Sequence, residues 1–184
     1  LTYSSVAANT AVTSSDAASD VVAGQTFALT TAVDVMTGSV GNDSFTGDNS
    51  GASNQLTSAD QLDGGDGTDV LNVFSSGSGD VSGLLTSVET INIYDLDDTF
   101  DTSAVTGVTA LNVYRGDGTQ AITVADGTTV NIVNSVGASA GITIDFGATA
   151  TAATVGLDKV DNAAVANSDV TFTGAKLTDA TFNV

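Results

Sequence analysis

The residues with the clearest chemical potential lie in a glycine–aspartate turn, Gly64-Gly65-Asp66-Gly67-Thr68-Asp69. Glycine tolerates positive φ angles, so such a turn can curl its carbonyl oxygens inward. Asp69 adds a short carboxylate at the end of the turn. Ca²⁺ takes about six to eight oxygen ligands at roughly 2.3–2.6 Å, so one turn supplies about half a site. The sequence therefore predicts a calcium site that a second turn must complete.

A second turn of the same kind is Gly38-Ser39-Val40-Gly41-Asn42-Asp43, in which Ser39 takes one glycine position. Asp60 and Asp63 enter the later turn and add two more carboxylates. Two unrelated surface turns are the alternative interpretation, because short motifs recur by chance. Each turn is followed by a strand-like run, however, and this favours calcium binding between them.

The elements that must position these turns are short strands that repeat one phrase. Apolar residues flank an Asn in Leu71-Asn72-Val73, Ile91-Asn92-Ile93, Leu111-Asn112-Val113 and Val130-Asn131-Ile132, and the Asn residues are 20, 20 and 19 positions apart. Ile142-Thr143-Ile144 and Phe182-Asn183-Val184 are related phrases, and Ala121-Ile122-Thr123-Val124 falls midway between two of them. In each phrase the apolar side chains share one face of a strand.

A fixed period near 20 residues, built from short strands and Gly/Asp corners, is typical of a solenoid. We therefore predict an all-β fold, a parallel β-solenoid of the β-roll or β-helix type with calcium-binding turns. Apolar side chains would stack inside, and Asn and Thr would stack outside or form an inward ladder at a corner. An antiparallel sandwich is the alternative, but it gives no reason for one phrase to recur at this period.

The expected organisation is one continuous domain with three parts. Residues 1–26 form an N-terminal arm or docking strand, residues 27–73 form a calcium-binding roll, and residues 74–184 form solenoid coils of about 20 residues. Leu1 is not an initiator Met, so we expect a processed product or a piece of a longer chain.

The charge of the chain excludes several classes of partner. The 184 residues include 22 acidic and three basic residues, for a net charge of −19, with no Cys and no His. Nucleic acid and anionic membranes are disfavoured electrostatically, and zinc, haem and thiol chemistry lack their usual ligands. No apolar run approaches the ~18 residues of a transmembrane helix.

A second acidic cluster comprises Asp95, Asp97, Asp98 and Asp101. A solvated turn is the preferred interpretation, and a weaker calcium site with Asp117 or Asp126 of the next coil is the alternative. Catalysis is not expected, because no aspartate pair is set apart by an apolar pocket. The Thr-x-Thr phrases are too irregular for the flat threonine face of an ice-binding solenoid.

The motifs resemble the RTX-type β-solenoid segments of bacterial surface-layer proteins and large adhesins secreted by type I systems. The two turns fit the nonapeptide G-G-x-G-x-D-x-U-x, the turn that begins at Gly64 in full and the turn that begins at Gly38 with Ser39 at one glycine position. Asp43 and Asp69 are 26 residues apart, so about eight residues are inserted relative to two nonapeptides, within Asp48–Asp60. The resemblance implies calcium contacts at Asp43 and Asp69 and at the carbonyls of Ser39, Gly41, Gly65 and Gly67.

The resemblance further implies export, folding outside the cell on meeting calcium, and assembly into a surface coat. We expect a structural, non-enzymatic protein at the cell surface that polymerises through its N-terminal arm and solenoid ends. A cell-surface glycan or polysaccharide is a further candidate partner, as an anchor. A calcium-stiffened stalk or binding module of a large adhesin is the alternative function.

Overall fold

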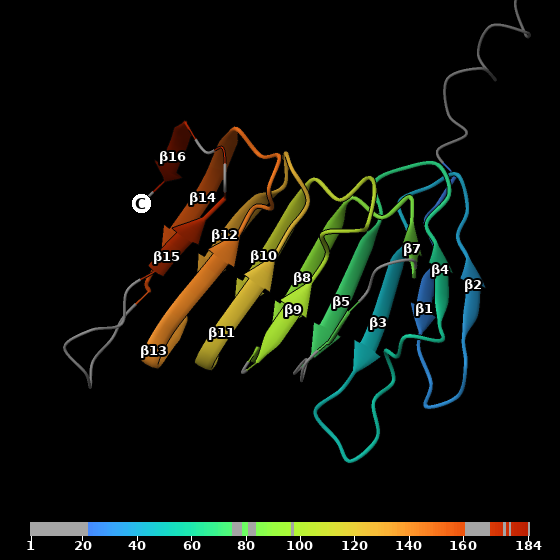
Figure 1. Ribbon diagram of the computed structural model, residues 1–184. Helices are drawn as coiled ribbons and strands as arrows, with labels where there is room; N and C mark the ends of the chain where they lie inside the picture. Colours follow the sequence, from blue (N-terminus) through green and yellow to red (C-terminus); the bar gives the residue numbers. More distant parts are fainter. Residues whose placement is uncertain are drawn as a thin grey trace, which may run out of the picture.

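The chain folds as a parallel β-solenoid (Figure 1). The computed structural model describes residues 22–74, 79–80, 84–96, 98–160, 170–174, 176 and 178–183. All strand pairs in this part are parallel and it contains no helix, hence none that could cross a membrane. The predicted fold class is therefore confirmed. Most of the predicted arm, residues 1–21, lies outside the described residues.

The strands form three sheets that wrap one interior. The largest sheet has the order β1-β3-β5-β8-β10-β12-β14-β16, and the others are β15-β13-β11-β9-β6 and β2-β4-β7. The bounds are β1 Thr26–Ala28, β2 Val35–Thr37, β3 Ser44–Asp48, β4 Gln61–Asp63, β5 Val70–Phe74, β6 Gly79–Asp80, β7 Leu85–Thr86, β8 Thr90–Tyr94, β9 Thr99–Asp101, β10 Ala110–Tyr114, β11 Asp117–Thr123, β12 Thr129–Val133, β13 Val136–Asp145, β14 Ala152–Asp158, β15 Val170–Thr173 and β16 Asp179–Asn183.

The repeated apolar–Asn–apolar phrase sets the register of the eight-stranded sheet. Asn72 pairs with Asn92, Asn92 with Asn112, and Asn112 with Asn131. The flanking apolar residues are fully buried and the Asn residues are half-buried on the outer face. Side chains alternate between the two faces of a strand, so one register buries every apolar member. The Asn residues therefore form an outer ladder, one of the two arrangements that the sequence left open.

Coil length varies along the stack. Backbone-to-carboxylate bonds link Gln25 with Asp43 across 18 residues and Asp43 with Asp69 across 26 residues, and later coils span 20, 20 and 19 residues. The longer coil contains the loop between β3 and β4, in which Asn49 Oδ1 accepts from the N–H groups of Gln55 and Leu56. This loop lies within the predicted insertion and leaves the register of the turns intact.

Ile142-Thr143-Ile144 belongs to the opposite sheet, contrary to its grouping with the Asn phrases. Ile144 pairs with Ile122 of β11, and both side chains point into the interior. The corresponding strand of the large sheet is β14, in which Gly156 takes the Asn position beside Asn131. A Cβ atom at Gly156 would clash with Oδ1 of Asn131, so a larger residue here would require the Asn131 side chain to move.

Candidate metal centre

The two glycine–aspartate turns lie directly on one another, one coil apart. Strand β2 pairs with β4 before the turns, and β3 pairs with β5 after them, so the intervening residues must stack. The N–H of Asp66 donates to the carbonyl of Ser39 at 3.2 Å. Gly65 (φ +90°) and Gly67 (φ +132°) lie against the carbonyl oxygens of Ser39 and Gly41, where a side chain would collide.

All six residues that the resemblance assigns to calcium therefore lie in this stacked pair of turns. They are Asp43, Asp69, Ser39, Gly41, Gly65 and Gly67. Whether they bind calcium remains a prediction.

Asp43 is held as a charged carboxylate. It is 1% exposed and accepts hydrogen bonds from the backbone N–H groups of Gln25 and Ser39, and from the Ser39 hydroxyl at 3.1 Å. The bond from Gln25 and then that from Ser39 lower the pKa of Asp43 below its usual value. The carboxylate thus links its own turn to the preceding coil.

Asp69 occupies the equivalent position in the next coil but has the opposite electrostatics. Its Oδ1 accepts the N–H of Asp43 at 2.6 Å, whereas its buried Oδ2 has no partner among the described residues. Burial, together with the charges of Glu89, Asp43 and Asp63, raises the pKa of Asp69. A buried, unpaired carboxylate oxygen is costly unless a proton or a cation compensates it.

Glu89 continues this column and was missed in the sequence analysis. Its Oε2 accepts the N–H of Asp69 at 2.8 Å, so Asp43, Asp69 and Glu89 form successive layers. Each residue directly precedes a strand of the large sheet. The signal was present in the sequence, because Glu89 is the only Glu and follows Asp69 by one 20-residue coil.

The oxygen atoms around the glycines fit a hard cation in part. A Cβ at Gly38 would meet the carbonyl oxygen of Gly64 and Oδ2 of Asp43, and a Cβ at Gly64 would meet the carbonyl oxygen of Ser87 and Oδ2 of Asp69. The same carbonyl–carboxylate pair therefore recurs in two layers. Within the described part of the chain no three acidic side chains gather as a metal-binding group. Backbone carbonyls would consequently have to provide most ligands, which Ca²⁺ accepts.

Asp63 lies beside the turns, whereas Asp60 does not join them. Asp63 accepts the N–H of Gly65 at 3.1 Å and lines an open depression of about 700 Å³. Asp60 lies at the other end of β4, fully buried. Its Oδ1 accepts the N–H of Asp34 at 2.8 Å, and its Oδ2 accepts the N–H of Thr57 at 2.7 Å. Both oxygens of Asp60 thus tie a corner together.

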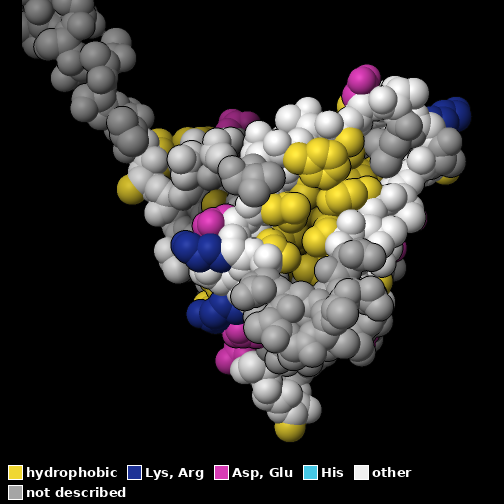
Figure 2. Space-filling view, turned by 90° about the vertical axis from the view of Figure 1, so that its left-hand side faces the viewer, with side chains coloured by type: hydrophobic (Ala, Val, Ile, Leu, Met, Phe, Trp, Pro, Cys, Tyr) yellow, Lys and Arg dark blue, Asp and Glu magenta, His cyan; other side chains and the backbone are white. Residues whose placement is uncertain are grey.

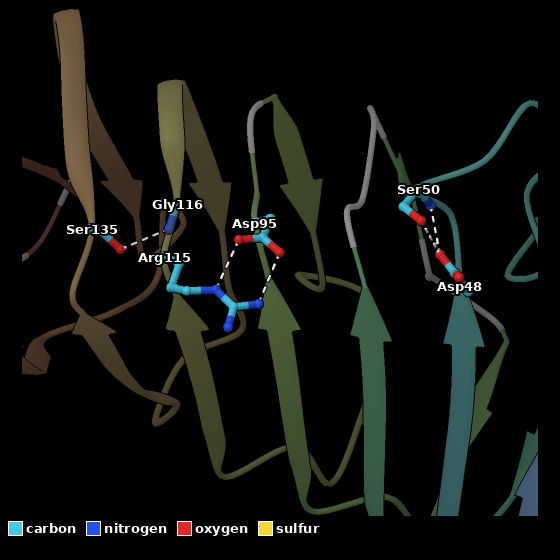
Figure 3. A network of polar contacts seen from close by, with 6 residues as sticks. All are labelled: Asp48, Ser50, Asp95, Arg115, Gly116 and Ser135. Carbon is cyan, nitrogen blue, oxygen red and sulfur yellow. Dashed lines mark hydrogen bonds and ion pairs between the residues drawn. The ribbon is translucent and has the colours of Figure 1, made fainter.

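The second acidic cluster is divided between separate contacts. Asp95 and Arg115, at the ends of β8 and β10, face each other in a two-bond ion pair with both distances 2.9 Å (Figure 3). This partner raises the pKa of Arg115. Asp101 caps the N–H of Ser103, Asp98 is exposed, and Asp97 lies outside the described residues. Asp95 is thus already paired with a cation of the chain itself.

Gln120 carries the other unpartnered buried polar atoms among the described side chains. Its amide nitrogen and oxygen are buried next to Gly116. The amide is neutral, so it does not by itself indicate a metal.

Comparison of the chain with protein-family models, with curated proteins and with solved structures finds no match. The resemblance to RTX-type surface-layer segments therefore depends on the motifs, their spacing and the chemistry of the stacked turns.

Proposed function

We propose that this protein is a structural, calcium-binding β-solenoid that assembles with its own copies into a surface layer or filament outside the cell. The observation that carries the proposal is the buried Oδ2 of Asp69, which has no described partner and lies next to Gly64 of its own turn, near the carbonyl oxygen of Ser87. The negative charges of Glu89, Asp43 and Asp63 act on Asp69 and favour the binding of a cation beside it.

Calcium binding is tested by replacing Asp69 with Asn. This isosteric change removes the charge and one oxygen ligand, so we expect calorimetry to show at least a tenfold loss of calcium affinity. Asp179→Asn is the matched control, because Asp179 is exposed in the distant strand β16 and belongs to neither acidic cluster. Equal calcium affinity in Asp69→Asn and the wild type would refute a site at these turns.

The ends of the solenoid support self-assembly. Phe182 continues the inward-facing column of Leu111, Val130 and Val155 but is 49% exposed. Apolar side chains gather on this end of the molecule (Figure 2). At the opposite end Val33 and Val35 are 64% and 71% exposed. Exposed apolar surface next to strand edges that are unpaired among the described residues favours head-to-tail association, which propagates without closing.

The expected connector is the N-terminal arm, which would add to a neighbour's open edge by β-augmentation. Deleting residues 1–16 should therefore abolish or shorten the ordered polymers that electron microscopy shows for the full chain in calcium. Polymers of unchanged order would show that the arm is not the connector. If the full chain stays monomeric at high concentration in calcium, the stalk of a larger adhesin becomes the better assignment.

A further inference from the structure

The outer face of the large sheet is uncharged across β5, β8, β10 and β12. This is unexpected in a chain of net charge −19. The strand register and the alternation of burial place these side chains outward: Val70, Asn72, Phe74, Thr90, Asn92, Tyr94, Ala110, Asn112, Tyr114, Thr129, Asn131 and Val133. We call this surface the amide–aromatic face. The adjoining strands of the same sheet carry Asp48 beside Phe74 and Asp158 beside Val133, and the outer face of the opposite sheet includes Asp101 and Asp145, so the uncharged surface is confined to these four strands.

Two side-chain ladders order this face. The amide of Asn92 donates to Asn72 at 2.9 Å, that of Asn112 to Asn92 at 2.8 Å, and that of Asn131 to Asn112 at 2.7 Å. Each inner amide keeps one N–H and one oxygen lone pair for a partner. The rings of Phe74, Tyr94 and Tyr114 stack beside them, with centroids 4.8 and 5.0 Å apart. Binding to this face therefore costs little additional side-chain entropy.

We propose that the amide–aromatic face is the lateral contact between two copies of this chain in the assembled polymer, an inference that rests on the proposed function. Depletion of charge with enrichment of Tyr and Phe is the composition of interface cores. Two copies of a strongly acidic protein repel each other, and a neutral face is where they can approach at least cost. Two-fold pairing of identical faces makes the contact self-complementary.

The geometry of the rings favours a protein partner over a polysaccharide. Successive ring planes lie within 16° of each other, so each ring covers the face of its neighbour. Arg115 lies over the ring of Tyr94, 5.8 Å from its centroid. A sugar that stacks on an aromatic side chain needs a free ring face, and only Phe74 and Tyr114, at the two ends of the stack, have a face that no other ring covers. Ring edges and amides suit another flat sheet.

The small area of the face explains why the contact would form between assembled filaments and not between free chains. Four strands about 4.8 Å apart and five residues of about 3.3 Å each cover roughly 300 Å². A stable complex buries about 800 Å² per partner, so a free dimer through this face alone would be weak. Repetition along two filaments adds many such contacts and gives the avidity that joins filaments into a sheet.

The test introduces one negative charge on each face in turn. Thr90→Asp and Thr129→Asp lie on the amide–aromatic face, where their cross-strand neighbours are uncharged. Thr143→Asp is the control on the opposite sheet, between Ala121 and Thr171. All three carry the same substitution at half-buried strand positions. Thermal melting first establishes that each purified variant folds like the wild type.

Electron microscopy in calcium should show sheets for the wild type and for Thr143→Asp, but single filaments for Thr90→Asp and Thr129→Asp. If both face variants form the same sheets as the wild type, the inference is overturned and the proposed function is left intact. A wild type without any polymer would refute the assembly function itself.

A second measurement identifies what lies against the amide–aromatic face in the assembled sheets. The chain has no Cys, so Thr90→Cys and Thr143→Cys each introduce a single thiol. A short thiol-reactive crosslinker should join copies of Thr90→Cys in sheets and leave Thr143→Cys as single chains. If instead an insoluble neutral polysaccharide retains the wild type but not Thr90→Asp, the face binds glycan and the inference is wrong.

Discussion

At the scale of single residues, Asp43 and Asp69 occupy the same position of the motif, yet the pKa of Asp43 is lowered and that of Asp69 is raised. Both end a glycine-rich turn, and both are buried. Backbone N–H groups of Gln25 and Ser39 stabilise the charged form of Asp43, whereas burial opposes ionisation of Asp69. The motif predicted that both residues would lie in the stacked turns. It could not predict the difference. Both carboxylates accept one N–H from the preceding coil, but Ser39 also donates to Asp43 within its own turn, whereas the N–H of Gly65 at the matching position donates elsewhere and leaves Oδ2 of Asp69 without a described partner.

The pKa of Asp69 predicts a pH dependence of stability in the absence of calcium. Its folded pKa is raised above the reference of 3.8, so the folded state keeps this proton to higher pH than the unfolded chain. Its contribution to the free energy of unfolding is therefore full below the unfolded pKa and is lost as pH rises through the folded pKa. Asp43 has a lowered pKa and behaves oppositely, losing its contribution as pH falls through that folded value.

Asp69→Asn should remove the pH dependence of stability that comes from Asp69 and keep the one that comes from Asp43. Thermal melts in chelator between about pH 4 and pH 7 should show a wild type that loses stability relative to Asp69→Asn as the pH rises. Other carboxylates titrate in both proteins, so the difference between the two curves isolates Asp69. A constant difference across this range would mean that Asp69 titrates normally in the fold.

At the scale of elements, the apolar–Asn–apolar phrase allowed the register of β5, β8, β10 and β12 to be predicted. The phrase failed at β14, where Gly156 replaces the Asn and the coil from Thr129 to Thr154 is longer. It also misplaced Ile142-Thr143-Ile144, since alternation predicts a half-buried strand without saying which sheet holds it. The corner role of Asp60 was equally invisible, because its partner Asp34 belongs to another coil.

The Asn ladder should contribute measurably to the cohesion of these strands. Asn112 donates one ladder bond and accepts another, whereas Asn131 donates one to Asn112. Each bond is worth about 0.5–1.5 kcal/mol net, so Asn112→Ala should cost roughly twice as much as Asn131→Ala. Urea unfolding of the two variants measures this ratio, and the shared Asn→Ala change cancels differences in strand propensity. Equal losses would mean that the ladder bonds add nothing to stability.

At the scale of the whole molecule, charge is distributed unevenly along the solenoid axis. Arg115 is the first basic residue of the chain, although thirteen acidic residues lie between 22 and 101. Asp34, Asp43, Asp60 and Asp69 are all buried in these first coils. The later coils combine fewer acids with Arg115, Lys159 and Lys176. An external cation would therefore reduce charge repulsion most in the N-terminal coils.

This asymmetry predicts that calcium orders the first coils selectively. A ligand that binds only the folded state adds RT ln(1 + [L]/Kd), about 2.7 kcal/mol at a hundredfold excess over Kd. Amide hydrogen exchange in chelator should be fast over residues 34–73 and slow in β10 and β12, and millimolar calcium should protect the first region. Circular dichroism should show a parallel gain of β-structure. Asp69→Asn should stay unprotected over 34–73 in the same calcium concentration, while Asp179→Asn should respond as the wild type does. If residues 34–73 are as protected in chelator as in calcium, the stacked turns close without a cation, and calcium has no part in folding this protein.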